Sequence, residues 1–93
     1  MKIKIKYFNI LREAAGTKEE FYSFSSIPAI QTALKEACSR HNSALKEKLF
    51  EESGKVKPAI LIFLNSQLVN CDRLDQKLSD NDELYLFPII SGG

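Results

Sequence analysis

The sequence predicts a small α+β domain, and three observations support this class. Residues 2–7 alternate strictly between lysine and apolar or aromatic side chains, which is the period of a half-buried strand. Apolar residues recur at helical spacing between positions 27 and 38. Residues 59–64 and 83–87 are two further apolar, strand-like segments. At 93 residues, the chain is long enough for one domain with a single hydrophobic core.

The first 24 residues predict a β-hairpin. In the first strand, the apolar side chains at positions 3, 5 and 7 share one face, and the lysines at positions 2, 4 and 6 share the other, which we expect to face solvent. A short turn over residues 11–16 follows, in which Gly16 can supply a positive φ. Residues 20–24 then return as the second strand.

The main helix is expected to begin at Ser26 and to end near position 40 or 41. Ser26 is a favourable N-cap, and Pro28 falls within the first turn, where its missing N–H does no harm. A short second helix is expected over residues 44–52. The apolar stripe of the main helix predicts a face that packs on the sheet: Ile27, Ile30, Ala33, Leu34, Ala37 and Cys38.

The second half of the chain predicts three more strands, over residues 59–64, 67–70 and 83–87. Pro88 is expected to end the pairing of the last one. Together, the elements indicate one main helix packed on one face of a mixed sheet of four or five strands, with the short helix added. If the first and last strands lie side by side in the middle, this is the β-grasp (ubiquitin-like) arrangement, an inference from the order of the elements.

The two strongest strands are apolar on both faces, with Leu61 and Phe63 opposite the residues at 60, 62 and 64, and Tyr85 and Phe87 opposite those at 84 and 86. One long helix covers only one face of a sheet, whereas apolar runs of this kind imply cover on both. The second face is therefore covered either by the short helix and its loop or by another protein. We favour a docking surface for a partner.

Composition excludes several classes of function. The chain has 13 basic and 12 acidic residues, a net charge of +1 that argues against nucleic acid as the main ligand. No apolar run is long enough to span a bilayer and no signal peptide is evident, so we expect a cytoplasmic protein. Cys38, Cys71 and His41 form no metal or redox motif. We expect two reduced thiols, a histidine at a helix end, and no bound cofactor.

The C-terminal sequence, FPIISGG, ends on two glycines. Such an end is either frayed chain or a reactive terminus. ATP can convert a terminal carboxylate into an acyl-adenylate, and sulfide or an amine can then displace AMP. Glycines suit this chemistry because they have no side chain to crowd a narrow channel. The first acceptor would make the chain a sulfur carrier through a thiocarboxylate, and the second would make it a protein modifier.

Three stretches together resemble the MoaD/ThiS family of sulfur carriers, and within it the small subunits of molybdopterin synthase. The first, IKIKYFNILREAAG, carries an F-x-x-x-R-E…G signature; the second is the turn at Asn65; the third is LSDNDELYLFPIISGG. The signature is matched at Phe8, Arg12, Glu13 and Gly16. The chain departs from the family pattern at Asn81, where glycine is usual, at Ile89, where a second proline is usual, and over residues 74–77, which resemble a small insertion.

The resemblance implies a sulfur-transfer function. A ubiquitin-activating-like enzyme would use ATP to adenylate Gly93, and a sulfurtransferase or cysteine desulfurase would supply the sulfur. The domain would then dock on the large subunit of molybdopterin synthase, in a heterotetramer, and give its sulfur to precursor Z. The chain would have no catalytic residue of its own and would bind no metal.

The same resemblance assigns roles along the tail and the sheet. Gly93 would carry the sulfur, with Ser91 and Gly92 giving reach. Residues 1–88 would form the domain and residues 89–93 a flexible tail. The residues expected to contact a partner are Arg12, Phe63, Tyr85, Phe87, Pro88, Ile89 and Ile90. Arg12 and Glu13 have an alternative role as an ion pair that stabilises the turn.

Other functions stay open. A carrier for thiamin thiazole would use the same chemistry, although the F-x-x-x-R-E opening disfavours it. A ubiquitin-like modifier would join Gly93 to lysines of other proteins. A plain binding module would not need the two glycines. An independent enzyme is least expected, because the sequence contains no catalytic constellation. The sequence does not identify the activating enzyme or the sulfur donor. It also does not show whether the final metal is molybdenum or tungsten.

Overall fold

The computed structural model describes residues 1–41 and 43–89. These residues form a mixed five-stranded sheet in the order β2-β1-β5-β3-β4. The strands are β1 (Lys2–Tyr7), β2 (Glu19–Ser23), β3 (Ile60–Leu64), β4 (Gln67–Val69) and β5 (Glu83–Pro88). The helices are α1 (Ile10–Ala15), α2 (Ile30–Ser39), α3 (Ser43–Leu49) and a single 3₁₀ turn, η1 (Cys71–Arg73).

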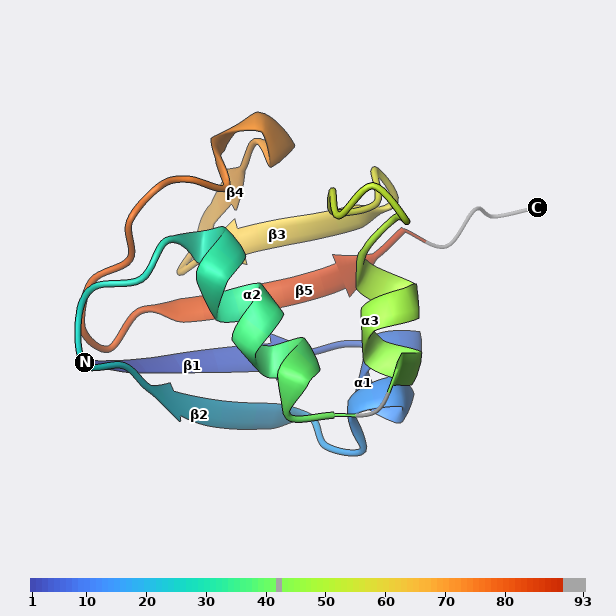
Figure 1. Ribbon diagram of the computed structural model, residues 1–93, viewed down its shortest axis with the longest axis horizontal. Helices are drawn as coiled ribbons and strands as arrows, with labels where there is room; N and C mark the ends of the chain where they lie inside the picture. Colours follow the sequence, from blue (N-terminus) through green and yellow to red (C-terminus); the bar gives the residue numbers. More distant parts are fainter. Residues whose placement is uncertain (42, 90–93) are drawn as a thin grey trace.

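The first and last strands lie side by side in the centre of the sheet (Figure 1). β1 runs parallel to β5, with Lys6 aligned with Tyr85, whereas β1–β2, β3–β4 and β3–β5 are antiparallel pairs. This central parallel pair confirms the β-grasp topology that the order of the elements predicts. It also confirms an α+β class with one main helix on a five-stranded sheet.

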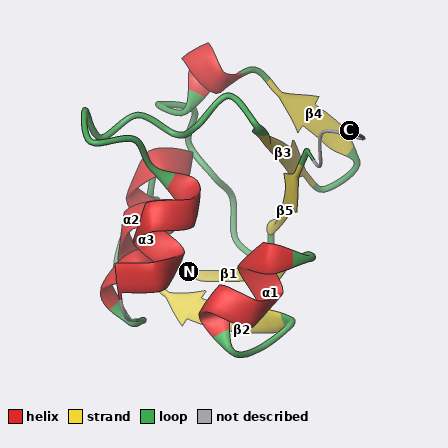
Figure 2. Ribbon diagram, turned by 90° about the vertical axis from the view of Figure 1, so that its right-hand side faces the viewer, coloured by secondary structure: helices red, strands yellow, loops and turns green. Residues whose placement is uncertain are grey.

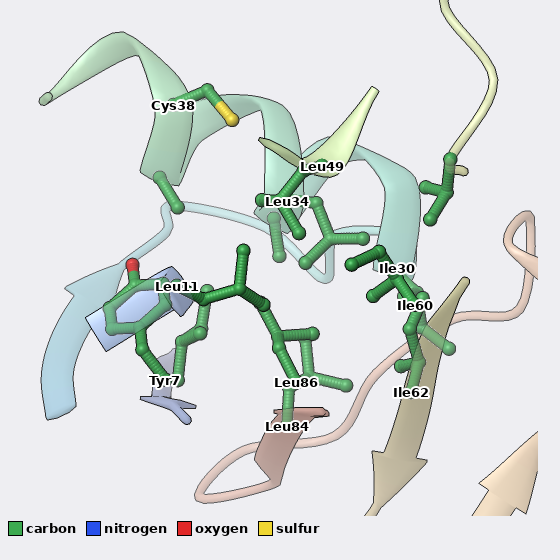
Figure 3. Packing of buried hydrophobic residues seen from close by; sticks show 14 of the residues in the cluster. Tyr7, Leu11, Ile30, Leu34, Cys38, Leu49, Ile60, Ile62, Leu84 and Leu86 are labelled. Atoms are coloured by element: carbon green, nitrogen blue, oxygen red, sulfur yellow. The ribbon is translucent and has the colours of Figure 1, made fainter. Parts of the chain in front are cut away.

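α2 and α3 lie on one side of the sheet and enclose the core (Figures 1 and 2). α2 contributes the predicted stripe from Ile30 to Cys38, and α3 adds Leu45 and Leu49. The strands β1, β3 and β5 contribute every second residue, including Ile62, Leu84 and Leu86 (Figure 3). Leu74 and Leu78 are also buried, so they anchor the polar segment after β4.

α2 begins three residues later than predicted, and Ser26 is not its N-cap. The N-cap is Ala29, and the N–H groups of Ile30 and Gln31 donate to the carbonyls of Gln76 and Leu74, at 2.9 Å each. The segment before β5 therefore satisfies N–H groups that a capping side chain would otherwise serve. As a result residues 24–29 are not helical, and Ile27 is exposed rather than part of the buried stripe.

Residues 10–15 form a helix, α1, where the sequence predicts only a turn. Gly16 ends it at φ 75°, and its N–H donates to the carbonyl of Arg12. Leu11 and Ala15 are one helical turn apart, and both are buried in the core. The predicted positive φ at Gly16 is thus confirmed, but it belongs to a helix C-terminus.

The remaining boundaries differ by a few residues. α3 ends at Leu49, not at position 52, because Phe50 forms a β-bridge with Val56. β4 ends at Val69, because the side chain of Asn70 caps η1. Pro88 does not end the pairing of β5, since the N–H of Ile89 still donates to the carbonyl of Ala59. Successive residues of a strand direct their backbone N–H groups to opposite neighbouring strands. Ile89 faces β3, so Pro88 faces β1, which has already ended at this level. The missing N–H of Pro88 therefore costs no hydrogen bond within the sheet.

A buried polar cluster joins the edge of the sheet to the end of α2. The hydroxyls of Tyr7 and Tyr22 lie 3.0 Å apart, and both donate to Oε1 of Glu20, at 3.2 and 2.8 Å. His41, which follows α2 as predicted, contacts the same oxygen through Nε2. Burial raises the pKa of both phenols above their usual value. The cluster therefore closes the open end of the core with fully partnered polar groups.

Within residues 1–41 and 43–89, no helix is long and apolar enough to cross a membrane.

Candidate functional site

The face of the sheet that points away from α2 and α3 carries an apolar patch. We define it as Phe8, Leu61, Phe63, Tyr85 and Phe87, which with Asn65 line an open hollow of about 640 Å³. All five side chains are partly exposed, whereas their neighbours at positions 60, 62, 84 and 86 are buried in the core. The alternation predicted for β3 and β5 is therefore confirmed.

The short helix does not cover the apolar patch. Leu45 and Leu49 of α3 pack into the core, on the same side of the sheet as α2 (Figure 1). In the part of the chain that the structure describes, α2 and α3 lie together on one side of β3 and β5 (Figure 2). The alternative in which the short helix covers this face is wrong, and the apolar patch is available to the partner that the sequence analysis favoured.

Aromatic contacts hold the apolar patch together. The rings of Phe8 and Phe87 stack with centroids 4.0 Å apart, and Phe63 meets Phe87 edge to face at 5.5 Å. Tyr85 lies next to Phe8, with centroids 6.4 Å apart. Stacked and edge-to-face pairs limit ring rotation. The rings therefore present a largely preformed surface, which lowers the entropy that docking must overcome.

Besides Leu61, Phe8 is the member of the apolar patch that the sequence did not identify as a docking residue. It follows β1, and its N–H donates to the carbonyl of Leu86 at 3.2 Å. The signal was present, because the alternation of Lys2, Lys4 and Lys6 continues to position 8 and puts Phe8 on the same face. Leu61 shares a face with Phe63 in the same way.

The other predicted contact residues are distributed around this patch. Pro88 is buried opposite Ile60, so it shapes the end of β5 rather than offering its own surface. Ile89 is 52% exposed and is held to Ala59 by its N–H, at 2.6 Å. Ile90, Ser91, Gly92 and Gly93, the remainder of the predicted tail, lie outside the described residues. The structure thus places the start of the tail beside the apolar patch.

Arg12 is exposed on α1 and does not pair with Glu13. Among residues 1–41 and 43–89 it makes no ion pair at all. The alternative role of Arg12 and Glu13 as an ion pair that stabilises the turn is therefore wrong. Arg12 instead lines a small hollow beside Phe8.

Tyr85 is the polar member of the apolar patch. Its hydroxyl donates to Oε1 of Glu83, which raises the pKa of Tyr85 and lowers the pKa of Glu83. On the other side, the ammonium group of Lys6 lies 5.4 Å from the Tyr85 ring centroid. Tyr85 is therefore neutral at physiological pH and offers a ring face to a partner.

Neither thiol forms part of this site. Cys38 is buried under α2, and burial raises its pKa to about 11, with Lys46 opposing the shift. Cys71 is exposed at the start of η1. Both are free thiols, as predicted. Across the described residues, no group of three or more His, Cys, Asp or Glu side chains could hold a metal ion.

Comparison with known families identifies the relatives of this chain. The model of the ThiS family matches residues 5–93, which includes the two terminal glycines. The chain belongs to the ThiS family. Its fold is the β-grasp, ubiquitin-like fold of that family, and the family consists of small sulfur carriers and modifiers that are not themselves catalysts.

Three similar proteins show the range of this family. Small archaeal modifier protein 3 of Haloferax volcanii is 26% identical over 94 residues, covering 100% of both chains. The crystal structure of SAMP1 from Haloferax volcanii is 27% identical, covers 100% of both chains and has a TM-score of 0.89. A Pyrococcus furiosus protein, provisionally described as molybdopterin converting factor, subunit 1, is 26% identical and has a TM-score of 0.73. The match covers 97% of this chain and 99% of the Pyrococcus furiosus chain.

Proposed function

We propose that this chain is a sulfur carrier whose C-terminal carboxylate, on Gly93, is converted to a thiocarboxylate in the cytoplasm. The observation that supports this most strongly is the uncovered apolar patch, which lies beside the residue where the tail begins. Phe87 lies in this patch only two residues before Ile89, where the described chain ends. A partner that docks on the patch is therefore positioned to receive the residues that follow.

The chemistry takes place in two steps. The Gly93 carboxylate attacks the α-phosphate of ATP on a ubiquitin-activating-like enzyme, which forms the acyl-adenylate and releases pyrophosphate. In the second step, the terminal sulfur of a cysteine persulfide on a sulfurtransferase or cysteine desulfurase attacks the acyl carbon and releases AMP. A cysteine thiol then cleaves the resulting acyl disulfide, which leaves the Gly93 thiocarboxylate and a new disulfide on the enzyme. Residues 90–93, if extended, span at most about 14 Å. That length allows Gly93 to reach an active site set back from the docking surface.

The proposed recipient is the large subunit of molybdopterin synthase, in a heterotetramer, and the sulfur goes to precursor Z. The F-x-x-x-R-E signature at Phe8, Arg12 and Glu13 supports this branch of the family. The similarity to the Pyrococcus furiosus protein also supports it. In this role Arg12 and the apolar patch contact the partner, while Ser91 and Gly92 give the tail its reach.

Intact-mass measurement tests the carrier function. The purified chain is incubated with ATP, an adenylating enzyme and a sulfur donor, and we expect one oxygen to be replaced by sulfur. A chain that lacks Gly93 should not change in mass under the same conditions. Adding the large subunit and precursor Z should then restore the original mass. An unchanged mass for the full chain, with an enzyme that is active on another carrier, would contradict the proposal.

Protein modification is the second candidate, and the similarity to small archaeal modifier proteins favours it. The two functions share the adenylate and differ only in the nucleophile. Lys77 is the last basic residue, so trypsin would leave the whole segment 78–93 attached to a modified lysine. We expect this remnant on lysines of cellular proteins if the chain is a modifier. If cells that contain the thiocarboxylate form of the chain in abundance carry no such remnant on their proteins, protein modification is excluded and the carrier function remains.

A further inference from the structure

Three cations surround a small hollow at the end of the sheet where the tail begins. Lys6 of β1, Arg12 of α1 and Lys18 before β2 line this hollow of about 120 Å³, together with Tyr7, Phe8 and Glu19. We call Lys6, Arg12 and Lys18 the basic corner. Figure 1 shows α1 and the end of β5 at the same end of the sheet. The basic corner is therefore close to the exit of the tail.

The chain itself does not neutralise the basic corner. Glu19 is shared between Lys4, at 3.6 Å, and Lys6, at 3.9 Å. Arg12 and Lys18 are exposed, and neither makes an ion pair within the described residues. Lys6 is thus partly balanced by Glu19 and Glu83, which it shares with Lys4, whereas the charges of Arg12 and Lys18 have no carboxylate partner among the described residues. This local excess is notable in a chain whose net charge is only +1.

The basic corner and the apolar patch form one continuous surface. Phe8 lines both hollows. Lys6 is aligned with Tyr85 in the parallel β1–β5 pair, and its ammonium group lies over the Tyr85 ring. A partner that covers the apolar patch must therefore also come close to the basic corner. Charges at the edge of an apolar interface set association rate and orientation more than they set affinity.

We propose that the adenylating enzyme, which receives the tail in the first step, carries Asp or Glu side chains opposite the basic corner, beside an apolar surface that meets the apolar patch. Lys6 and Lys18 are then docking residues in addition to Arg12. Their attraction to the partner's carboxylates orients the domain so that the tail points into the active site. This inference rests on the proposed function, since it concerns the same partner.

The salt dependence of activation tests this inference. ATP–pyrophosphate exchange is measured with the adenylating enzyme of the source organism, over a series of carrier concentrations. For Lys18→Glu, we expect the half-saturating concentration to rise about 5-fold in ~0.05 M salt and the difference to shrink below about 2-fold in ~0.5 M salt. The effect should fall on the half-saturating concentration rather than on the maximal rate, because Lys18 orients the partner and takes no part in the chemistry.

Lys35→Glu on α2 is the matched control, since it makes the same charge change on the helical side of the sheet. Urea unfolding verifies that both variants fold. Equal half-saturating concentrations for Lys18→Glu and Lys35→Glu in low salt would overturn the inference while leaving the carrier function intact. If the wild-type chain supports no exchange at any concentration, the proposed function fails, and the inference fails with it.

Discussion

Glu20 is the residue on which the buried polar cluster depends. One of its oxygens accepts hydrogen bonds from Tyr7 and Tyr22 and contacts His41. Burial raises the pKa of Glu20, but the hydrogen bonds from His41, Tyr22 and Tyr7 outweigh it and hold the pKa below the usual 4.5. The ionised form is therefore the one that the folded state stabilises.

This direction of shift fixes the pH dependence of stability. A carboxyl group with a lowered folded-state pKa stabilises the fold fully above its unfolded pKa, and the contribution is lost as the pH falls through the folded value. We expect Glu20→Gln to lower the free energy of unfolding by about 1 kcal/mol at pH 7. Urea titrations should show this difference shrinking as the pH falls below 4.5. A difference that stays constant down to pH 3 would contradict the assignment.

Asn81 tests a departure from the family pattern at the scale of one residue. Its φ is 69°, and its N–H donates to the carbonyl of Lys2 at 2.7 Å. Only glycine, asparagine and aspartate adopt this left-handed conformation readily. We expect Asn81→Ala to cost about 1 kcal/mol in free energy of unfolding, and Asn81→Gly to change it by less than ~0.5 kcal/mol. Thermal or urea unfolding measures both, and equal costs would exclude the backbone explanation.

Single residues also show what the sequence predicts well. Asn81 stands where glycine is usual in the family, and it has the left-handed conformation that both residues tolerate. Asn9 has φ 54° as well, but no turn signal in the sequence marks it. It lies at the start of α1, an element that the sequence did not predict. The conformation of Asn9 was therefore missed because the helix that it precedes was missed.

Among the elements, α1 contributes more to stability than its six residues suggest. Leu11 is fully buried, whereas Ile10 beside it is 44% exposed. We expect Leu11→Ala to lower the free energy of unfolding by about 2–4 kcal/mol, because it leaves a cavity at the end of the core. Ile10→Ala, the matched control, should cost less than ~0.5 kcal/mol. Similar urea midpoints for the two variants would show that α1 is not packed as described.

Elements with strong periodicity were predicted, and elements defined by distant contacts were not. β1, β3 and β5 alternate regularly, so their faces follow from the sequence alone. α1 offers only Leu11 and Ala15 as buried positions, too few to establish a helical period. α2 begins at Ile30 because carbonyls more than forty residues later accept its first N–H groups. No local pattern around Ser26 could reveal that contact.

For the whole molecule, part of the candidate site could be predicted from the alternation along the strands, and part became evident only from the tertiary structure. Phe63, Tyr85 and Phe87 were predicted from the strand period, and the structure brings them together with Phe8 and Leu61. That α3 leaves this face open could not be predicted, because a short amphipathic helix can pack on either side of a sheet. The basic corner is also tertiary, since its cations come from three separate segments.

The central claim is that docking and chemistry belong to separate parts of the molecule, the apolar patch and the tail. A chain that lacks Gly92 and Gly93 should therefore still bind the adenylating enzyme, although it cannot be activated. Phe63→Asp in that shortened chain should weaken binding about 10-fold or more, because it places a charge in the centre of the apolar patch. Ile27→Asp, at an exposed isoleucine before α2, is the matched control.

The most direct measurement is competitive inhibition of thiocarboxylate formation on the full-length chain, followed by intact mass. The account predicts that the shortened chain and its Ile27→Asp variant inhibit equally well, and that the Phe63→Asp variant inhibits at least about 10-fold less. If the shortened chain does not inhibit at any concentration, the enzyme recognises the tail alone. That result would contradict the role assigned to the apolar patch.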